Sequence, residues 1–252
     1  MSPRWKAWTL ALALTAAAIG PAFAREKKVT LPEMIRDLKT QEQEDGNFRA
    51  KISAQGEIRA LLLTGGCNRP ENIRTLAGLT TLRSLSTNCL PQDALQELTG
   101  ILSSLTGLQK LYVASPVAKA WDLDFFKALS SLREMRQLRL GYATLPTGGL
   151  KLIADLPNLA VLELPSVRQL NPQDLEELQR CPHLVELSAR GARLDDTAVK
   201  FILGIKSLKF LDIEDTRLSQ ESKAALQARG ITLRSFANHE DMPGTPWRPW
   251  ME

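Results

Sequence analysis

The chain has 252 residues with a formal net charge of +4, and 44% of its residues are hydrophobic. Three cysteines are too few for a disulfide scaffold, and the length allows one or two domains. Removal of residues 1–24, whose charged residues are Arg4 and Lys6, lowers the net charge to +2, so the charge indicates no nucleic-acid partner.

Residues 1–24 have the pattern of a secretory signal peptide. Arg4 and Lys6 form a basic start, an apolar run extends from Trp8 to Ile19, and Ala22-Phe23-Ala24 is a small-x-small cleavage pattern. The run is shorter than the roughly 20 residues of a membrane-spanning helix. We therefore expect cleavage, no transmembrane segment afterwards, and an exported protein that is periplasmic or secreted. The alternative is an uncleaved N-terminal anchor.

Residues 25–57 are predicted to form an N-terminal cap. Thr30 can cap a short helix with Pro32 in its first turn and Glu33 three places after Thr30. Around Phe48 and Ile52 the pattern favours a short extended piece. The alternative is a mobile leader without a capping role.

Residues 58–236 repeat one apolar phrase, L-x-x-L-x-L, in about eight units. The copies begin at Ile58, Leu82, Leu108, Met135, Leu159, Leu184, Leu208 and Ile231. Successive copies are 24, 26, 27, 24, 25, 24 and 23 residues apart. An interval this long and this constant indicates a repeated supersecondary unit.

Each unit is predicted to contain a short strand, a turn and a returning helix. The phrase alternates at its end, as a strand with one buried face does. Further along each unit the apolar residues are three apart, which places them on one side of a helix, as in Leu150, Ile153 and Leu156. A single unit would leave this core open, so the units must stack.

These phrases resemble the leucine-rich-repeat family from about Ile58 to Phe236. The resemblance implies an α/β solenoid with parallel strands on its concave face and short helices on its convex face. One feature departs from the family pattern. The ninth place of each repeat is commonly Asn, Cys or Thr, but here only Thr216 matches, so the turn backbone must find other partners.

Residues 237–252 form a tail that contains prolines and tryptophans. Three prolines prevent it from continuing a helix or a strand ladder. Trp247 and Trp250 can fold back over the last repeat or form a free peptide that a partner binds, and the sequence does not separate these two interpretations.

The sequence contains no recognisable catalytic constellation. His183 lies at a helix–strand joint, and His239 lies in the tail without an obvious partner. Metal-binding and phosphate-binding motifs are missing, and Asp195-Asp196 matches a helix start rather than a calcium site. We therefore expect no enzyme activity, no metal and no cofactor.

Two of the three cysteines are candidates for a disulfide. Cys67 and Cys89 follow the strand phrases of adjacent repeats, and neighbouring strands lie within the Cα separation that a disulfide accepts. Cys67 holds the tenth place of its repeat and Cys89 the eighth place of its own, so their register is not ideal for a disulfide. A Cys67–Cys89 bridge and two unbridged thiols therefore remain the two alternatives. Cys181 ends an apolar helical row and is predicted to be a small buried residue.

The residues between the leucines are predicted to form a binding face. The candidates are Arg59, Arg83, Lys110, Tyr112, Arg136, Arg139, Tyr142, Glu163, Glu186 and Asp212. Their order gives a basic half followed by an acidic half, as for a partner of matching polarity. Tyrosine and arginine are also enriched at interface hot spots.

The predicted function is a non-catalytic, exported, monomeric module that binds a protein or peptide. The concave face spans about 34 Å over seven strand intervals, which suits such a partner better than a small molecule. The alternative is a scaffolding repeat protein of the cell envelope without one tight ligand.

Overall fold

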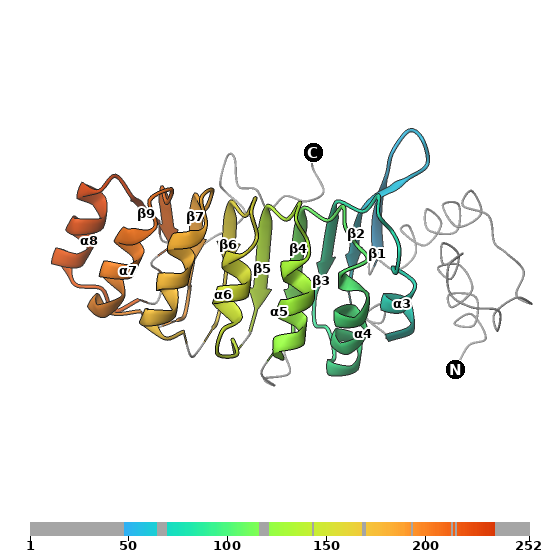
Figure 1. Cartoon of the computed structure of the whole chain (residues 1–252), viewed down its shortest axis with the longest axis horizontal. Helices are drawn as coiled ribbons and strands as arrows, with labels where there is room; N and C mark the ends of the chain where they lie inside the picture. Colours follow the sequence, from blue (N-terminus) through green and yellow to red (C-terminus); the bar gives the residue numbers. More distant parts are fainter. Residues whose placement is uncertain are drawn as a thin grey trace, which may run out of the picture.

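The computed structural model describes residues 48–64, 70–115, 121–142, 144–167, 170–192, 194–212, 214 and 216–234. The predicted signal peptide, the predicted helix near Thr30 and the tail 237–252 lie outside these residues. The described strands form one nine-stranded sheet in chain order, β1 to β9 (Figure 1).

All neighbouring strands from β2 to β9 are parallel, and β1 alone pairs antiparallel with its neighbour β2. The strands are β1 (Phe48–Ile52), β2 (Ile58–Leu63), β3 (Ser84–Thr87), β4 (Lys110–Ala114), β5 (Gln137–Gly141), β6 (Val161–Glu163), β7 (Glu186–Ser188), β8 (Phe210–Asp212) and β9 (Thr232–Arg234). The extended piece expected around Phe48 and Ile52 is therefore present as β1.

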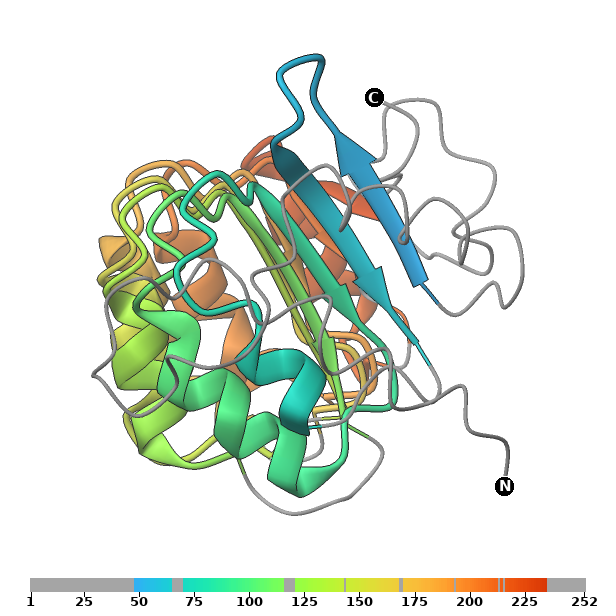
Figure 2. The same ribbon diagram turned by 90° about the vertical axis from the view of Figure 1, so that its right-hand side faces the viewer.

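The described helices all pack on one side of this sheet, as the end-on view shows (Figure 2). The α-helices among the described residues are α3 (Pro70–Arg74), α4 (Gln92–Leu102), α5 (Leu123–Ser130), α6 (Gly149–Ala154), α7 (Val199–Gly204) and α8 (Gln220–Ala228). Two units use 3-10 helices on the same side, η4 (Pro172–Arg180) and η5 (Asp196–Ala198).

The strand register confirms the repeat. The fourth-place residues align as direct partners across all eight parallel strands: Leu61, Leu85, Leu111, Leu138, Leu162, Leu187, Leu211 and Leu233. The first seven of them are buried under the helices. The fold is a leucine-rich-repeat solenoid. Its spine forms because each unit can bury its leucines only against those of the next unit.

Side-chain caps fix where several helices begin. Asp122 accepts the Phe125 N–H at 2.9 Å and Ser219 accepts the Ser222 N–H at 3.1 Å. Asn171 and Asp195 cap η4 and η5 in the same way. Each cap satisfies a backbone donor that the first turn leaves without an acceptor. Asp195 is thus a helix cap, as the sequence predicts.

The longest repeat, which starts at Leu108, is filled by an aromatic cluster. Trp121, Phe125 and Phe126 are fully buried, and the Trp121 and Phe125 rings meet edge to face with centroids 4.6 Å apart. The stack continues through this unit, because β4 and β5 pair in parallel register.

Three of the four ninth-place residues that the structure describes enter the core. Leu90, Val167 and Ala192 are buried there. Their turns find backbone partners in the next unit: the Leu90 N–H donates to the Ala114 carbonyl at 2.8 Å, and Ser115 Oγ donates to the Leu90 carbonyl at 2.9 Å. An apolar ninth place is tolerated because neighbouring turns satisfy each other.

The eighth place has a left-handed backbone in four repeats. Cys89, Tyr142, Ser166 and Gly191 have φ angles of 58°, 57°, 61° and 74°. Glycine adopts this conformation without steric cost, whereas other residues lose about 1–2 kcal/mol. In these four repeats the chain leaves the sheet edge through this turn, so the fold imposes the conformation on Cys89, Tyr142 and Ser166.

Candidate binding face

The strand face is the side of the sheet opposite the helices. We define it by the third and fifth places of the repeats. The third-place row runs Ala60, Ser84, Lys110, Gln137, Val161, Glu186, Phe210 and Thr232. The fifth-place row runs Leu62, Ser86, Tyr112, Arg139, Glu163, Ser188, Asp212 and Arg234. Every predicted site residue except Arg59, Arg83, Arg136 and Tyr142 belongs to one of these rows.

The basic half of the face has two contributors that the sequence analysis missed. On β1, Arg49 is the partner of Leu62 and Lys51 the partner of Ala60, so both side chains extend the rows beyond β2. Both residues are exposed. Alternation within "FRAKI" places them on one side, but nothing in the sequence predicts the antiparallel pairing that adds them to this face.

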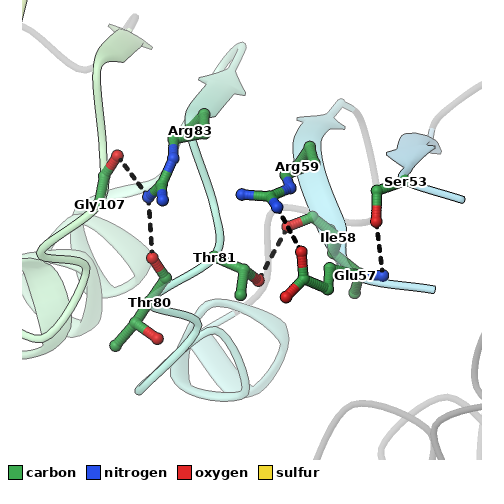
Figure 3. A network of polar contacts seen from close by, with 8 residues as sticks. All are labelled: Ser53, Glu57, Ile58, Arg59, Thr80, Thr81, Arg83 and Gly107. Carbon is green, nitrogen blue, oxygen red and sulfur yellow. Dashed lines mark hydrogen bonds and ion pairs between the residues drawn. The ribbon is translucent and has the colours of Figure 1, made fainter. Parts of the chain in front are cut away.

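Two of the predicted basic residues are part of the scaffold instead (Figure 3). Arg59 forms an ion pair with Glu57. Arg83 Nη1 donates to the Thr80 carbonyl at 3.0 Å and to the Gly107 carbonyl at 2.9 Å. Arg83 thus ties one helix–strand turn to the next and does not point across the strand face.

Lys110 and Arg136 remain as basic residues at the centre of the basic half. Lys110 is partly exposed on β4, and Arg136 is exposed immediately before β5. Neither forms an ion pair with a described acid. Among the predicted basic residues, these two have the charge most accessible to a partner.

Tyr112, Arg139 and Glu163 form a ladder across three adjacent strands. The Arg139 guanidinium lies 4.9 Å from the Tyr112 ring centroid, and its Nη1 is 3.3 Å from Glu163 Oε2. Glu163 is only 4% exposed. Burial raises the pKa of Tyr112, which the charge of Arg139 opposes. Because loss of one partner of a buried ion pair costs about 3–5 kcal/mol, Arg139 also supports the fold.

The predicted acidic half also contains paired arginines. Arg234 Nη1 is 3.7 Å from Glu186 Oε2, and its guanidinium lies 3.7 Å from the centroid of the Phe210 ring. Arg190 Nη2 is 2.7 Å from Glu214 Oε1. The two ends of the face therefore differ less in charge than the sequence predicts, because Arg190 and Arg234 are not among the predicted site residues.

Asp212 is a structural acid rather than an exposed one. It is 2% exposed, accepts the Ser188 hydroxyl at 2.9 Å through Oδ2, and accepts the Glu214 N–H at 2.9 Å through Oδ1. These bonds join β7, β8 and the turn after β8. Asp212 thus holds the edge of the face in place.

Tyr142 stands at the rim of the face in one of the left-handed turns. Its side chain is 60% exposed, and its N–H donates to the Pro165 carbonyl at 3.0 Å. A bulky aromatic residue with positive φ is a strained feature, and such features gather at functional sites. Tyr142 is therefore an accessible aromatic group in the turn that follows β5, the strand that carries Arg139.

The three cysteines have separate environments. Cys89 is an exposed free thiol, and Cys67 lies outside the described residues, so a bridge between them stays a prediction. Cys181 is buried, as predicted, and burial raises the pKa of its thiol to about 11. Among the described residues no group of His, Cys, Asp and Glu side chains could hold a metal ion. No helix in that part of the chain is long and apolar enough to cross a membrane.

No protein-family model matches the sequence, and no curated protein is significantly similar to it. Solved structures similar to the chain include an internalin from Listeria monocytogenes, with 22% identity and a TM-score of 0.49 over 69% of this chain and 46% of that one. A second is the PEPR1–AtPEP1 complex, with 17% identity and a TM-score of 0.41 over 73% of this chain and 25% of that one. A third is a leucine-rich-repeat protein of Leptospira interrogans, with 14% identity and a TM-score of 0.36 over 65% of this chain and 56% of that one. The chain spans about half or less of the first two.

Proposed function

We propose that the protein is a non-catalytic binding module that captures a protein or peptide on its strand face. Leucine-rich-repeat solenoids are typically protein-binding modules. The observation that carries the proposal is the grouping of Lys110, Tyr112, Arg139 and Tyr142 on β4, β5 and the turn after β5. These residues combine accessible charge with fixed aromatic surface, which is the composition of interface hot spots.

The size of the face favours a macromolecular partner. Seven intervals from β2 to β9 at about 4.8 Å each give a surface on the order of 34 Å long. The bases at one end are the exposed Arg49, Lys51 and Arg136 and the partly exposed Lys110. They favour a partner with an acidic segment, whose approach they would steer and orient.

We further propose that the protein is exported. The support is the signal-peptide pattern in residues 1–24, which lie outside the described structure. Mass spectrometry of the N-terminus of the protein from its producing cell tests this: a mature chain that begins at Arg25 supports export, and an intact Met1 with the protein in the cytoplasm refutes it.

A photocrosslinking amino acid at position 110 tests the binding proposal directly. Position 151 on α6 provides a matched control, because Lys151 is exposed on the opposite side of the sheet. We expect defined adducts from 110 and none from 151. Equal adducts from both positions would support the scaffold alternative.

Charge reversal provides the second arm, with the photocrosslinking amino acid kept at position 110. Lys51 and Arg136 are each replaced by Glu, since changes at Arg83 or Arg139 would damage the scaffold. The control replaces Arg133 and Lys206, which are exposed outside the sheet, by Glu and changes the net charge equally. Only the first variant should lose the adducts formed from position 110.

A further inference from the structure

β1 is an edge strand of the sheet. It stands first in the strand order, and β2 is the only described strand that pairs with it. The pairing is antiparallel and runs along the whole of β1, from Phe48 with Leu63 to Ile52 with Ile58. A strand that is paired along one side only has backbone N–H and C=O groups on its other side with which a further strand can pair. Figure 2 views the sheet from this end.

The side chains of β1 alternate between charged and apolar. Arg49 and Lys51 lie on the strand face, and both are exposed. Ala50 and Ile52 lie on the helix side of the sheet, where both are partly buried and Ala50 packs against the core. A strand added at this edge would therefore place every second side chain beside Arg49 and Lys51 and the others beside Ala50 and Ile52.

The charges of Arg49 and Lys51 are available for a partner. Neither residue forms an ion pair with a described acid. Side chains that lie directly opposite each other on paired strands have Cβ atoms about 4.5–5.5 Å apart, which brings an acid within reach of a base. Acids at alternate places of an added strand would thus pair with both bases, and such opposite-charge pairs stabilise a sheet.

The same two bases disfavour a second copy of the chain at this edge. If two β1 strands paired antiparallel around Ala50, Arg49 of each would lie opposite Lys51 of the other. Pairing of β1 with β9 of another copy would add Arg234 to the same row of bases. Like charges directly opposite each other destabilise a strand pair, and charged side chains on edge strands prevent self-association in natural sheets. The edge is therefore closed to itself and open to an acidic strand.

The opposite end of the described sheet suits such a partner less well. β9 has three residues, whereas β1 has five and so offers more backbone groups for pairing. The base on β9 is also engaged already, because the Arg234 guanidinium lies 3.7 Å from the Phe210 ring centroid and its Nη1 lies 3.7 Å from Glu186 Oε2. Length and available charge therefore both favour β1.

We propose that β1 is a docking site for an extended segment of a partner protein that has acidic residues at every second place and apolar residues between them. The segment continues the sheet as a further strand, in which backbone hydrogen bonds supply affinity and the alternating side chains supply specificity. This inference goes beyond the proposed function, because the edge at β1 and the strand face are different surfaces and either can bind without the other.

Hydrogen exchange of the full chain, read by mass spectrometry at β1, tests this proposal with the synthetic peptide Thr-Glu-Val-Glu-Val-Glu-Thr as the probe. We expect saturating peptide to slow exchange in Phe48–Ile52 several-fold. The control is a peptide of the same composition whose glutamates and valines form separate blocks, and it should give no protection. Equal protection by both peptides, or by neither, would overturn the proposal. So would protection that rises with protein concentration alone, because a second copy would then supply the strand.

A charge swap locates the contact. The double variant Arg49→Glu, Lys51→Glu should bind the glutamate peptide more weakly by about tenfold or more, and it should gain binding to the peptide in which lysine replaces glutamate. That gain also shows that the variant is folded. The control Arg133→Glu, Lys206→Glu changes the net charge equally at exposed positions outside the sheet and should keep the original preference. A swapped variant that still prefers the glutamate peptide would refute the proposed pairing.

The edge proposal and the strand-face proposal can fail separately. If the glutamate peptide protects β1 while a photocrosslinking amino acid at position 110 forms no adducts, the edge proposal stands and the strand-face proposal loses support. If position 110 forms adducts and the peptide gives β1 no protection, only the edge proposal is refuted.

Discussion

The Arg83 guanidinium occupies the space that a side chain at Gly107 would need. A Cβ on Gly107 would lie 1.6 Å from Arg83 Nη1 and 2.2 Å from the Thr80 carbonyl oxygen. Glycine at this position lets Arg83 bond to two carbonyls in adjacent repeats. The pair joins β3 to β4 at the edge where the helices return to the sheet.

Gly107→Ala should therefore destabilise the protein. Arg83 can swing away, but the Thr80 carbonyl is backbone and cannot move cheaply, so we expect a loss of about 1–3 kcal/mol. Urea unfolding followed by circular dichroism measures the change in midpoint.

Gly100→Ala is the control for this prediction. Gly100 is exposed in α4, and a Cβ there would meet nothing within 4 Å. Because glycine is unfavourable in a helix, this variant should gain roughly 0.5–1 kcal/mol. If both variants shift the midpoint in the same direction, the proposed tight contact at Gly107 is wrong.

A second prediction concerns the left-handed turns. Ser166 (φ 61°) should prefer glycine, so Ser166→Gly should stabilise the fold by about 0.5–1 kcal/mol. Gly191→Ala should destabilise it by about 1–2 kcal/mol, because alanine would be forced to φ 74° with its Cβ 3.4 Å from Ser166 Cα. Thermal unfolding of both variants measures these opposite shifts.

The spine of the fold could be predicted from the sequence because one type of interaction sets it. Leu111, Leu138 and Leu162 recur at the interval that one unit needs, and burial leaves them a single register. The eighth-place turn could not be predicted. Cys89, Tyr142 and Ser166 share no side-chain property, and the path of the chain at the sheet edge, not their own preference, sets their φ angles.

The contacts of the side chains on the strand face were harder to predict than the spine, because long charged side chains can point in several directions. Arg83 and Arg136 both hold the second place of their repeats, yet Arg83 bonds to turn carbonyls while Arg136 is exposed and forms no ion pair with a described acid. Ion pairing also depends on residues that were not among the predicted site residues, as the pair of Arg234 with Glu186 shows. The place of a residue in the repeat thus fixes the position of its backbone but not the contacts of its side chain.

A third prediction tests Asp212 as a structural residue. Asp212→Ala leaves the Ser188 hydroxyl and the Glu214 N–H without their acceptor in a buried site, so we expect a loss of about 1.5–3 kcal/mol. Asp212→Asn should lose less, because the amide can still accept from Glu214 and donate to Ser188. Equal losses, measured by denaturant unfolding, would show that charge and not hydrogen bonding determines the stability at this site.

A fourth prediction concerns the pH dependence of Glu186. Burial raises the pKa of this carboxyl, Asp212 adds to the shift, and Arg234 opposes it. The folded protein therefore binds the proton more tightly than the unfolded chain, and its stability falls as pH rises from the usual glutamate pKa of about 4.3 through the raised value. Glu186→Gln removes this cost. It should be more stable than the parent at pH 7 and equal to it below about pH 4.

Glu97→Gln should show the opposite sign. A hydrogen bond from Arg74 lowers the pKa of Glu97, so the stability that this carboxylate adds is present at neutral pH and is lost as pH falls through the lowered value. Glu97→Gln should therefore be less stable than the parent at pH 7, with the difference closing in acid. If denaturant unfolding across pH 3–7 gave both variants the same sign, the Arg234 pair and not burial would dominate at Glu186.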